Sequence, residues 1–163
     1  MSFNLYEIQL AMIHYFQNDV RRINHALKVH SFAKLIAACE TVSEEELLII
    51  EISALLHDIG IKHAELKYHS SSGKYQELEG PPVAQKLLFP FSLSEKSLSR
   101  ILYLIGHHHS YSKIEGLDFQ ILVESDFIVN IFEDSMDKNN LLTIKDKYFK
   151  TKTGIHLLTS MFS

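Results

Sequence analysis

The stretch EEELLIIEISALLHDIG (residues 44–60) decides the fold, because an apolar helical run ends there in two adjacent polar side chains. Ser43 and Glu46 form a capping-box pattern that predicts the start of the helix, and the final glycine is a natural stop. The run is apolar enough to predict a helix at the centre of the domain. The imidazole of His57 and the carboxylate of Asp58 are costly in a core unless a partner neutralises or coordinates them.

The composition is that of a globular domain with one core. The chain has 163 residues, of which 46% are hydrophobic and 22% charged, and its net charge is −4. It therefore lacks the basic footprint of a nucleic-acid-binding protein. Cys39 is the only cysteine, which excludes a disulfide framework and fits a reducing, cytoplasmic compartment. No signal peptide and no apolar run long enough for a membrane span is found, so we expect no membrane partner.

The rest of the chain predicts further helices and no strands. Helical patterns extend over residues 20–40, 81–89, 96–109, 117–134 and 140–163. Residues 61–80 break the pattern and predict a long loop, after which Pro81 and Pro82 suit the first turn of a helix. We expect residues 1–163 to form one all-α domain, with the segment 140–163 as its closing helices.

Polar side chains interrupt several of these apolar helices. His25 lies between Ile23 and Ala26, a run of three histidines (107–109) ends another helix, and Asp126 interrupts ILVESDFIVNIF. Each has an ordinary explanation, such as a hydrogen-bonded core histidine or a solvated helix end that suits imidazolium. Together, imidazole and carboxylate groups from separate helices form a ligand set suited to a divalent ion. The sequence therefore predicts a metal centre.

The order of these residues resembles the HD superfamily of metal-dependent phosphohydrolases over residues 19–135. The three motifs are similar to HALKVHSFA with His25, LLHDIG with His57 and Asp58, and LVESD with Asp126. The resemblance implies a helical bundle of the HD-domain type that binds one or two divalent ions. Fe and Mn are the first candidates for these ions, and Zn, Co and Mg are also compatible with the ligand set.

One branch of the superfamily, which hydrolyses diadenosine tetraphosphate, binds two metals and is the closest in motif layout. In EGPPVA, Glu79 takes the place of a histidine ligand of that branch, and IGHH supplies His108. Branches with an adjacent histidine pair would add His109 and leave His107 as a flanking residue, but the register within the run stays open. The signature of the cyclic-dinucleotide branch is missing from SYSKIEGLDF, so that substrate is set aside.

The resemblance implies hydrolysis of a nucleotide or another small phosphate ester by a metal-activated water. Asp58 would bind metal and orient or deprotonate that water. Lys62 is the first candidate for binding substrate phosphate, followed by Lys74 and Arg22. Tyr75 and Gln76, in the expected loop over residues 61–80, are candidates for contact with a nucleobase.

Two other functions fit the same motifs. A di-iron oxygenase would use the metal ligands for oxygen chemistry, and a non-catalytic regulatory module would use the pocket to bind a nucleotide. A purely structural helical domain would leave His57 and Asp126 without partners. A homodimer is also left open, because several large apolar residues suit either a core or an interface: Phe89, Phe91, Tyr103, Phe149 and Met161.

Overall fold

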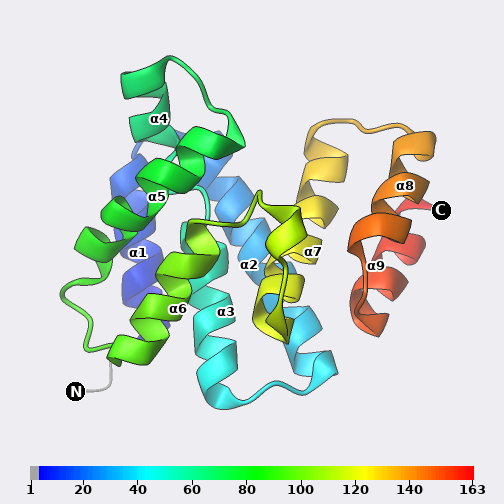
Figure 1. The fold of residues 1–163 in the computed structure, drawn as a ribbon, viewed down its shortest axis with the longest axis horizontal. Coiled ribbons are helices and arrows are strands. Elements are labelled where there is room, and N and C mark those ends of the chain that lie inside the picture. The colour runs from blue at the N-terminus through cyan, green and yellow to red at the C-terminus, as the bar shows by residue number, and fades with distance from the viewer. Residues whose placement is uncertain (1–3) are drawn as a thin grey trace.

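The chain folds into helices joined by short connections (Figure 1). The structure is a computed structural model and describes residues 4–163, within which no strand occurs. The elements are α1 (Leu5–Phe16), α2 (Val20–Glu40), α3 (Glu44–Leu56), α4 (Ile61–Tyr68), α5 (Gly73–Leu88), α6 (Glu95–Ile105), the 3-10 turn η1 (Tyr111–Lys113), α7 (Gly116–Glu133), α8 (Lys138–Tyr148) and α9 (Lys152–Phe162). The prediction of an all-α bundle is confirmed.

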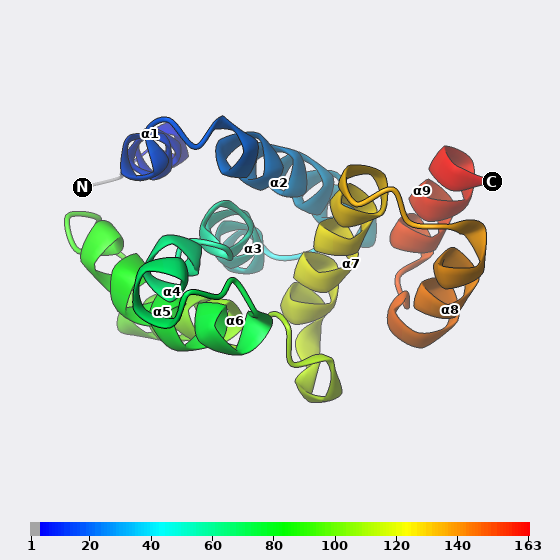
Figure 2. The ribbon, with the colours of Figure 1, turned by 90° about the horizontal axis from the view of Figure 1, so that it is seen from above.

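Helix α3 is the central element of the bundle. It begins at the predicted capping box, where Ser43 Oγ accepts from the Glu46 backbone and the Glu46 carboxylate accepts from the Ser43 backbone. Every residue from Ile49 to Leu56 is buried, because α1, α2, α6 and α7 pack around the helix. Figure 2 shows α3 between the layer of α1 and α2 and the layer of α5 and α6. A helix enclosed in this way is mostly apolar on all its faces, and its one buried carboxylate, Glu51, is paired with His30 Nε2 at 3.0 Å.

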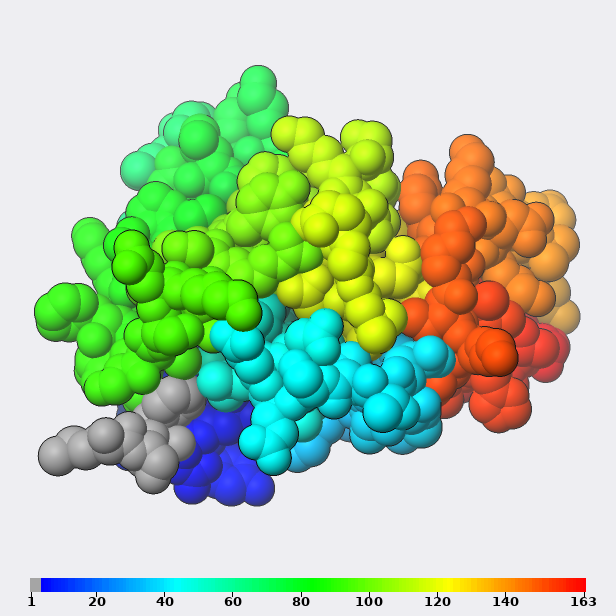
Figure 3. Space-filling model, turned by 60° about the horizontal axis from the view of Figure 1, so that its bottom comes forward, coloured from blue at the N-terminus to red at the C-terminus, as the bar shows by residue number. Residues whose placement is uncertain are grey.

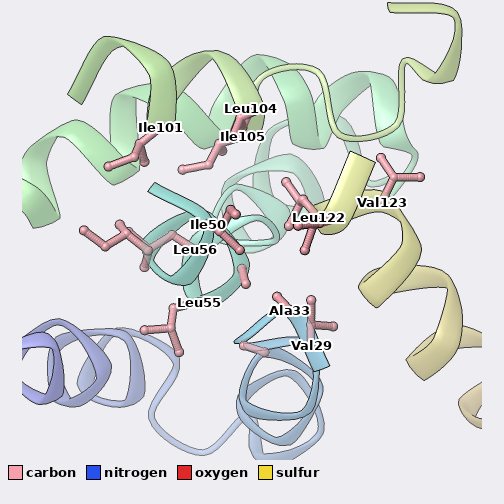
Figure 4. Packing of buried hydrophobic residues seen from close by; sticks show 14 of the residues in the cluster. Val29, Ala33, Ile50, Leu55, Leu56, Ile101, Leu104, Ile105, Leu122 and Val123 are labelled. Atoms are coloured by element: carbon pink, nitrogen blue, oxygen red, sulfur yellow. The ribbon is translucent and has the colours of Figure 1, made fainter. Parts of the chain in front are cut away.

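Small side chains allow α2 to approach α3 and α7 closely. Val29, Ala33 and Ala37 of α2 are fully buried, and α2 packs along both neighbouring helices. Figure 4 shows side chains of α2, α3, α6 and α7 meeting in one apolar core. This core fixes the positions of the helices that carry the polar residues.

The expected long loop over residues 61–80 is wrong. The structure forms α4 there, starts α5 at Gly73, and leaves only residues 69–72 as a connection. Pro81 and Pro82 therefore lie inside α5 rather than in its first turn. Helix α4 buries only Ile61 and Ala64, too few apolar positions to show helical periodicity in the sequence. Helix α1 was also not predicted.

The C-terminal helices α8 and α9 form one end of the molecule (Figure 3). Glu124, a fully buried residue of α7, binds Thr151, the N-cap residue of α9. Its carboxylate accepts from the backbone N–H of Thr151 at 2.9 Å and from the Thr151 hydroxyl at 2.6 Å. This buried carboxylate is therefore satisfied within the protein.

The large apolar side chains divide between core and surface. Phe149 is buried, whereas the Phe89 side chain is 88% exposed. A homodimer stays a prediction.

Among the described helices, none combines the length and the hydrophobicity that crossing a bilayer requires.

A close approach between the turn after α3 and helix α5 requires glycine. A Cβ at Gly60 would lie 2.5 Å from the backbone nitrogen of Gly80 and 2.6 Å from the carbonyl oxygen of Gln76. Gly60 has an ordinary right-handed helical conformation, so the constraint is the lack of space. This contact holds the turn that carries Asp58 against α5.

We expect Gly60→Ala to lower the free energy of unfolding by about 1–3 kcal/mol, because overpacking displaces rigid backbone. Gly106→Ala is the matched control, since Gly106 has a similar conformation and its Cβ would lie no closer than 3.1 Å to a neighbouring atom. Urea denaturation of both variants measures the difference. Equal losses in the two variants would contradict the steric argument.

Candidate metal centre

Four helices bring six predicted ligands to one region of the bundle. The first is His25 in the second turn of α2, and the pair His57–Asp58 follows directly where α3 ends. The pair His108–His109 follows α6, and Asp126 lies in the middle of α7. Because α2, α3 and α7 pack against one another and α6 packs on α3, residues a hundred positions apart meet.

Four of these side chains form a first cluster. The Nε2 atoms of His25 and His57 are 3.1 Å apart, and His25 Nε2 lies 3.1 Å from Asp126 Oδ1. Asp58 Oδ2 is 3.4 Å from both Nε2 atoms. The two imidazoles and two carboxylates therefore face a common point.

Hydrogen bonds on the far sides of the rings fix which nitrogen faces that point. His57 Nδ1 is 2.8 Å from the carbonyl oxygen of Ala54, which can only accept, so Nδ1 donates. His25 Nδ1 donates in the same way to the Glu133 carboxylate at 2.8 Å. Both Nε2 atoms then carry lone pairs that point at each other, an arrangement that needs a proton or a cation between them.

Three side chains form a second cluster that shares Asp58. Asp58 Oδ1 lies 3.4 Å from His108 Nε2, and one ligand atom each of Asp58, His108 and His109 lies within 4.8 Å of the others. His108 Nδ1 donates to the Ile105 carbonyl, which leaves its Nε2 buried with no hydrogen-bond partner within residues 4–163. A buried acceptor of this kind fits a metal ligand.

The packing around His109 also depends on a glycine. The His109 ring lies against Gly73 at the start of α5, where a Cβ would come within 2.8 Å of the ring. Its Nε2 is 3.2 Å from Gln76 Oε1. Burial, reinforced by the neighbouring His108, lowers the pKa of His109 to about 4. The ring is therefore neutral at pH 7 and retains a lone pair for coordination.

The charges of the first cluster depend strongly on one another. Burial alone would lower the pKa of His57, but the carboxylates of Asp58 and Asp126 outweigh it and raise the pKa to about 10. Burial opposes the charge on Asp126, yet His57 and His25 hold its pKa well below the usual range. Positive charge must therefore accompany these carboxylates, and a divalent cation can supply it in place of imidazole protons.

A cleft of about 450 Å³ leads from solvent to the first cluster, and we call it the metal-centre cleft. Its wall is mostly polar. Besides residues of the cluster, polar side chains line it, among them Arg21, Arg22, Gln76, Asn130, Glu133 and Asp134. The ligand set, its burial and its access to solvent suit a metal centre that a small substrate can reach.

Comparison with protein families matches the HD domain model to residues 22–147, most of the chain. The chain belongs to the HD domain family. A crystal structure of a predicted HD superfamily hydrolase from an uncultured Thermotogales bacterium has the same fold, with a TM-score of 0.71 and 23% sequence identity. The match covers 97% of this chain and 84% of the other. A comparison with curated proteins gave no match.

The structure does not bring Glu79 to the metal centre of this HD domain, and its assignment as a ligand is corrected. Its carboxylate accepts from Lys67 at 2.8 Å and from the Tyr68 hydroxyl at 3.1 Å. Glu79 lines a separate cavity between α1, α4 and α5. Gln76, one turn earlier on α5, faces the metal-centre cleft instead.

The predicted phosphate-binding cations also lie elsewhere. The Lys62 ammonium lies over the Tyr15 ring at 5.3 Å, and the Lys74 ammonium lies over the Tyr75 ring at 5.8 Å. Neither lysine lines the metal-centre cleft. Arg22 does line it, but its guanidinium is engaged by Asp19 and Glu65.

Two cleft residues that contact the first cluster were missed in the sequence. Asn130 donates to Asp126 Oδ1 at 3.0 Å, and Glu133 accepts from His25. Both follow Asp126 on α7 at spacings of four and seven residues, which place them on the same helix face. That spacing is the signal that could have found them.

We expect chelation of bound metal to lower the melting temperature of this HD domain, and Mn²⁺ to restore it. A cation at 100 times its Kd stabilises the folded state by about 2.7 kcal/mol, a shift of about 5–10 °C for a domain of this size. Thermal unfolding with and without Mn²⁺ measures the shift. His57→Ala should lose the response and Glu79→Ala should keep it; a wild type that does not respond would contradict the assignment.

Proposed function

We propose that this chain is a metal-dependent phosphohydrolase whose substrate is a small, polar phosphate ester. The observation that carries this proposal is the position of Asp58 between two ligand clusters. Its Oδ2 faces His25 and His57, and its Oδ1 faces His108, each at 3.4 Å. A carboxylate with one oxygen facing each cluster can hold two ions close together, and a two-metal hydrolytic site depends on such closely spaced ions.

The residues present suit that chemistry. A divalent ion bound at such a site acts as a Lewis acid and makes water a nucleophile near neutral pH. His25, His57, Asp58 and Asp126 would hold one ion, and Asp58, His108 and His109 would hold another. Asp58 is 16% exposed in its side chain and borders the cleft, so it can also orient a water for attack on phosphorus.

The lining of the metal-centre cleft supports a compact substrate over a nucleotide. Among the described residues that line it, no Phe or Tyr offers a face for stacking a base. Of the two candidates for base contact, Gln76 lines the cleft but has no ring, whereas Tyr75 lies outside the lining and stacks on Tyr68 with ring centroids 4.1 Å apart. Polar groups such as Asn130 and Asp134 suit hydroxyl groups of a substrate.

Arg21 is the cation best placed to bind the phosphate. It lines the cleft, its side chain is 80% exposed, and its nearest carboxylate, Asp134, is 3.9 Å away. The Arg22 guanidinium, by contrast, is held by two carboxylates. Arg21 is therefore free to turn towards an anionic substrate.

The main test uses protein purified anaerobically, with elemental analysis and a panel of phosphate esters that includes sugar phosphates and nucleotides. We expect one or two Fe, Mn or Zn ions for each chain and release of inorganic phosphate. Asp58→Ala should lose both metal and activity because it removes the shared ligand. Glu79→Gln is the matched control and should retain both. An empty wild type, or oxygen uptake without phosphate release, would refute the proposal.

Replacing Arg21 tests the proposed phosphate contact. We expect Arg21→Ala to raise KM for the preferred ester about tenfold, which corresponds to the loss of about 1.4 kcal/mol of binding. Steady-state kinetics measure the change, with Lys62→Ala as the control because its ammonium lies over Tyr15. A larger effect of Lys62→Ala than of Arg21→Ala would exclude this role.

A further inference from the structure

The three imidazoles that point Nε2 into the two clusters are held from behind by different groups. His57 and His108 donate their Nδ1–H groups to backbone carbonyls of Ala54 and Ile105. His25 alone donates to a carboxylate, that of Glu133, at 2.8 Å. A carboxylate behind a ligating imidazole orients the ring and makes it a stronger donor than a neutral carbonyl does.

Glu133 is itself fixed in place. Its side chain is only 14% exposed, and its second oxygen accepts from Lys28 Nζ at 2.8 Å. It is the last residue of α7 and lies two helical turns after Asp126. Helix α7 therefore presents Asp126 to the Nε2 of His25 and Glu133 to the Nδ1 of the same ring.

The second cluster lacks comparable support. Its carboxylate, Asp58, is shared with the first cluster. His109 contacts the neutral amide of Gln76 rather than a carboxylate. The first cluster, in contrast, has Asp126 in addition to Asp58. More negative charge and a better-oriented imidazole both favour a cation in the first cluster.

We infer that the two metal positions differ in affinity, with the first cluster filled first and Glu133 setting its tighter binding through His25. Glu133 is a positioning residue, since it acts on the ion through the imidazole. This inference rests on the proposed metal-dependent function but goes beyond it, because it ranks the two positions and assigns the ranking to one residue.

The test is a titration of the metal-free chain of 163 residues with Mn²⁺ alone, monitored by calorimetry and by electron paramagnetic resonance. We expect wild type to bind in a tighter and a weaker step. Glu133→Gln should weaken the tighter step by about 10–100-fold and leave the weaker step unchanged. His109→Ala should do the opposite.

Asp134→Asn is the matched control for Glu133→Gln. Asp134 is the next residue and is also acidic, but its carboxylate pairs with Arg21 and not with a histidine. A general effect of charge would therefore weaken binding in both variants, whereas the positioning role predicts a loss only in Glu133→Gln. The metal-free melting temperatures of these variants separate positioning from stability, since positioning predicts lost affinity without a matching loss of melting temperature.

The outcomes distinguish this inference from the proposed function. Two equal steps in wild type, or a Glu133→Gln variant with unchanged affinity, would overturn the inference and leave a metal-dependent hydrolase standing. Equal weakening in Asp134→Asn would also overturn it. No Mn²⁺ binding by wild type would overturn both.

Discussion

Lone pairs that converge in a buried space are the constraint on which the rest of this structure depends. The Nε2 atoms of His25 and His57 stand 3.1 Å apart beside the carboxylates of Asp58 and Asp126, and His108 Nε2 has no hydrogen-bond partner among the described residues. The outer hydrogen bonds of these rings commit their Nδ1 atoms as donors. The cluster is therefore rich in acceptors and poor in donors, and only positive charge from protons or a metal makes it stable.

The scaffold is organised to hold that arrangement against repulsion. Helix α3 is buried along its C-terminal half, so the His57–Asp58 pair at its end has little freedom to move towards solvent. The close backbone contact at Gly60 and Gly80 fixes the following turn on α5, and the contact between Gly73 and His109 fixes the second cluster on the same helix. Close packing at these glycines therefore holds the imidazole and carboxylate groups of the two clusters near one another.

Residues of the candidate metal centre are easier to predict from the sequence than the residues around it, and the reason is physical. His57 and Asp126 stand out because polar groups in apolar helical runs need partners, a requirement visible without coordinates. Glu79 was misplaced because residues up to 80 were expected to form a loop, in which a side chain has no fixed direction. In α5, Gln76 and Glu79 lie on faces about 60° apart, and only the first faces the cleft.

The misplaced lysine illustrates a second limit of the sequence. Lys62 follows the HD pair closely, and its position on a turn gave no indication of direction. The structure adds α1, whose Tyr15 ring lies under the Lys62 ammonium. Because that contact joins segments nearly fifty residues apart, it depends on how the helices pack and not on a local pattern. The positions of the side chains in the wall of the metal-centre cleft likewise depend on how the helices pack.

Helix α7 shows how carboxylates that the protein itself satisfies differ from a candidate metal ligand. Asp118, Glu124 and Asp126 are all buried on this apolar helix. Asp118 accepts two hydrogen bonds from Arg100, at 2.6 and 2.7 Å, and Glu124 accepts two from Thr151, the N-cap residue of α9. Both are satisfied by donors that the protein supplies permanently.

Asp126 is different because its neighbours are the lone-pair nitrogens of His25 and His57, with Asn130 as its one neutral donor. All three carboxylates are buried and lie on the same helix, so neither burial nor position on α7 identifies a site by itself. What distinguishes Asp126 is that its two imidazole partners also lack a donor unless they are protonated. A buried carboxylate that faces such nitrogens, with one amide as its only neutral donor, has the surroundings of a cation ligand, and in this chain it coincides with the HD motif.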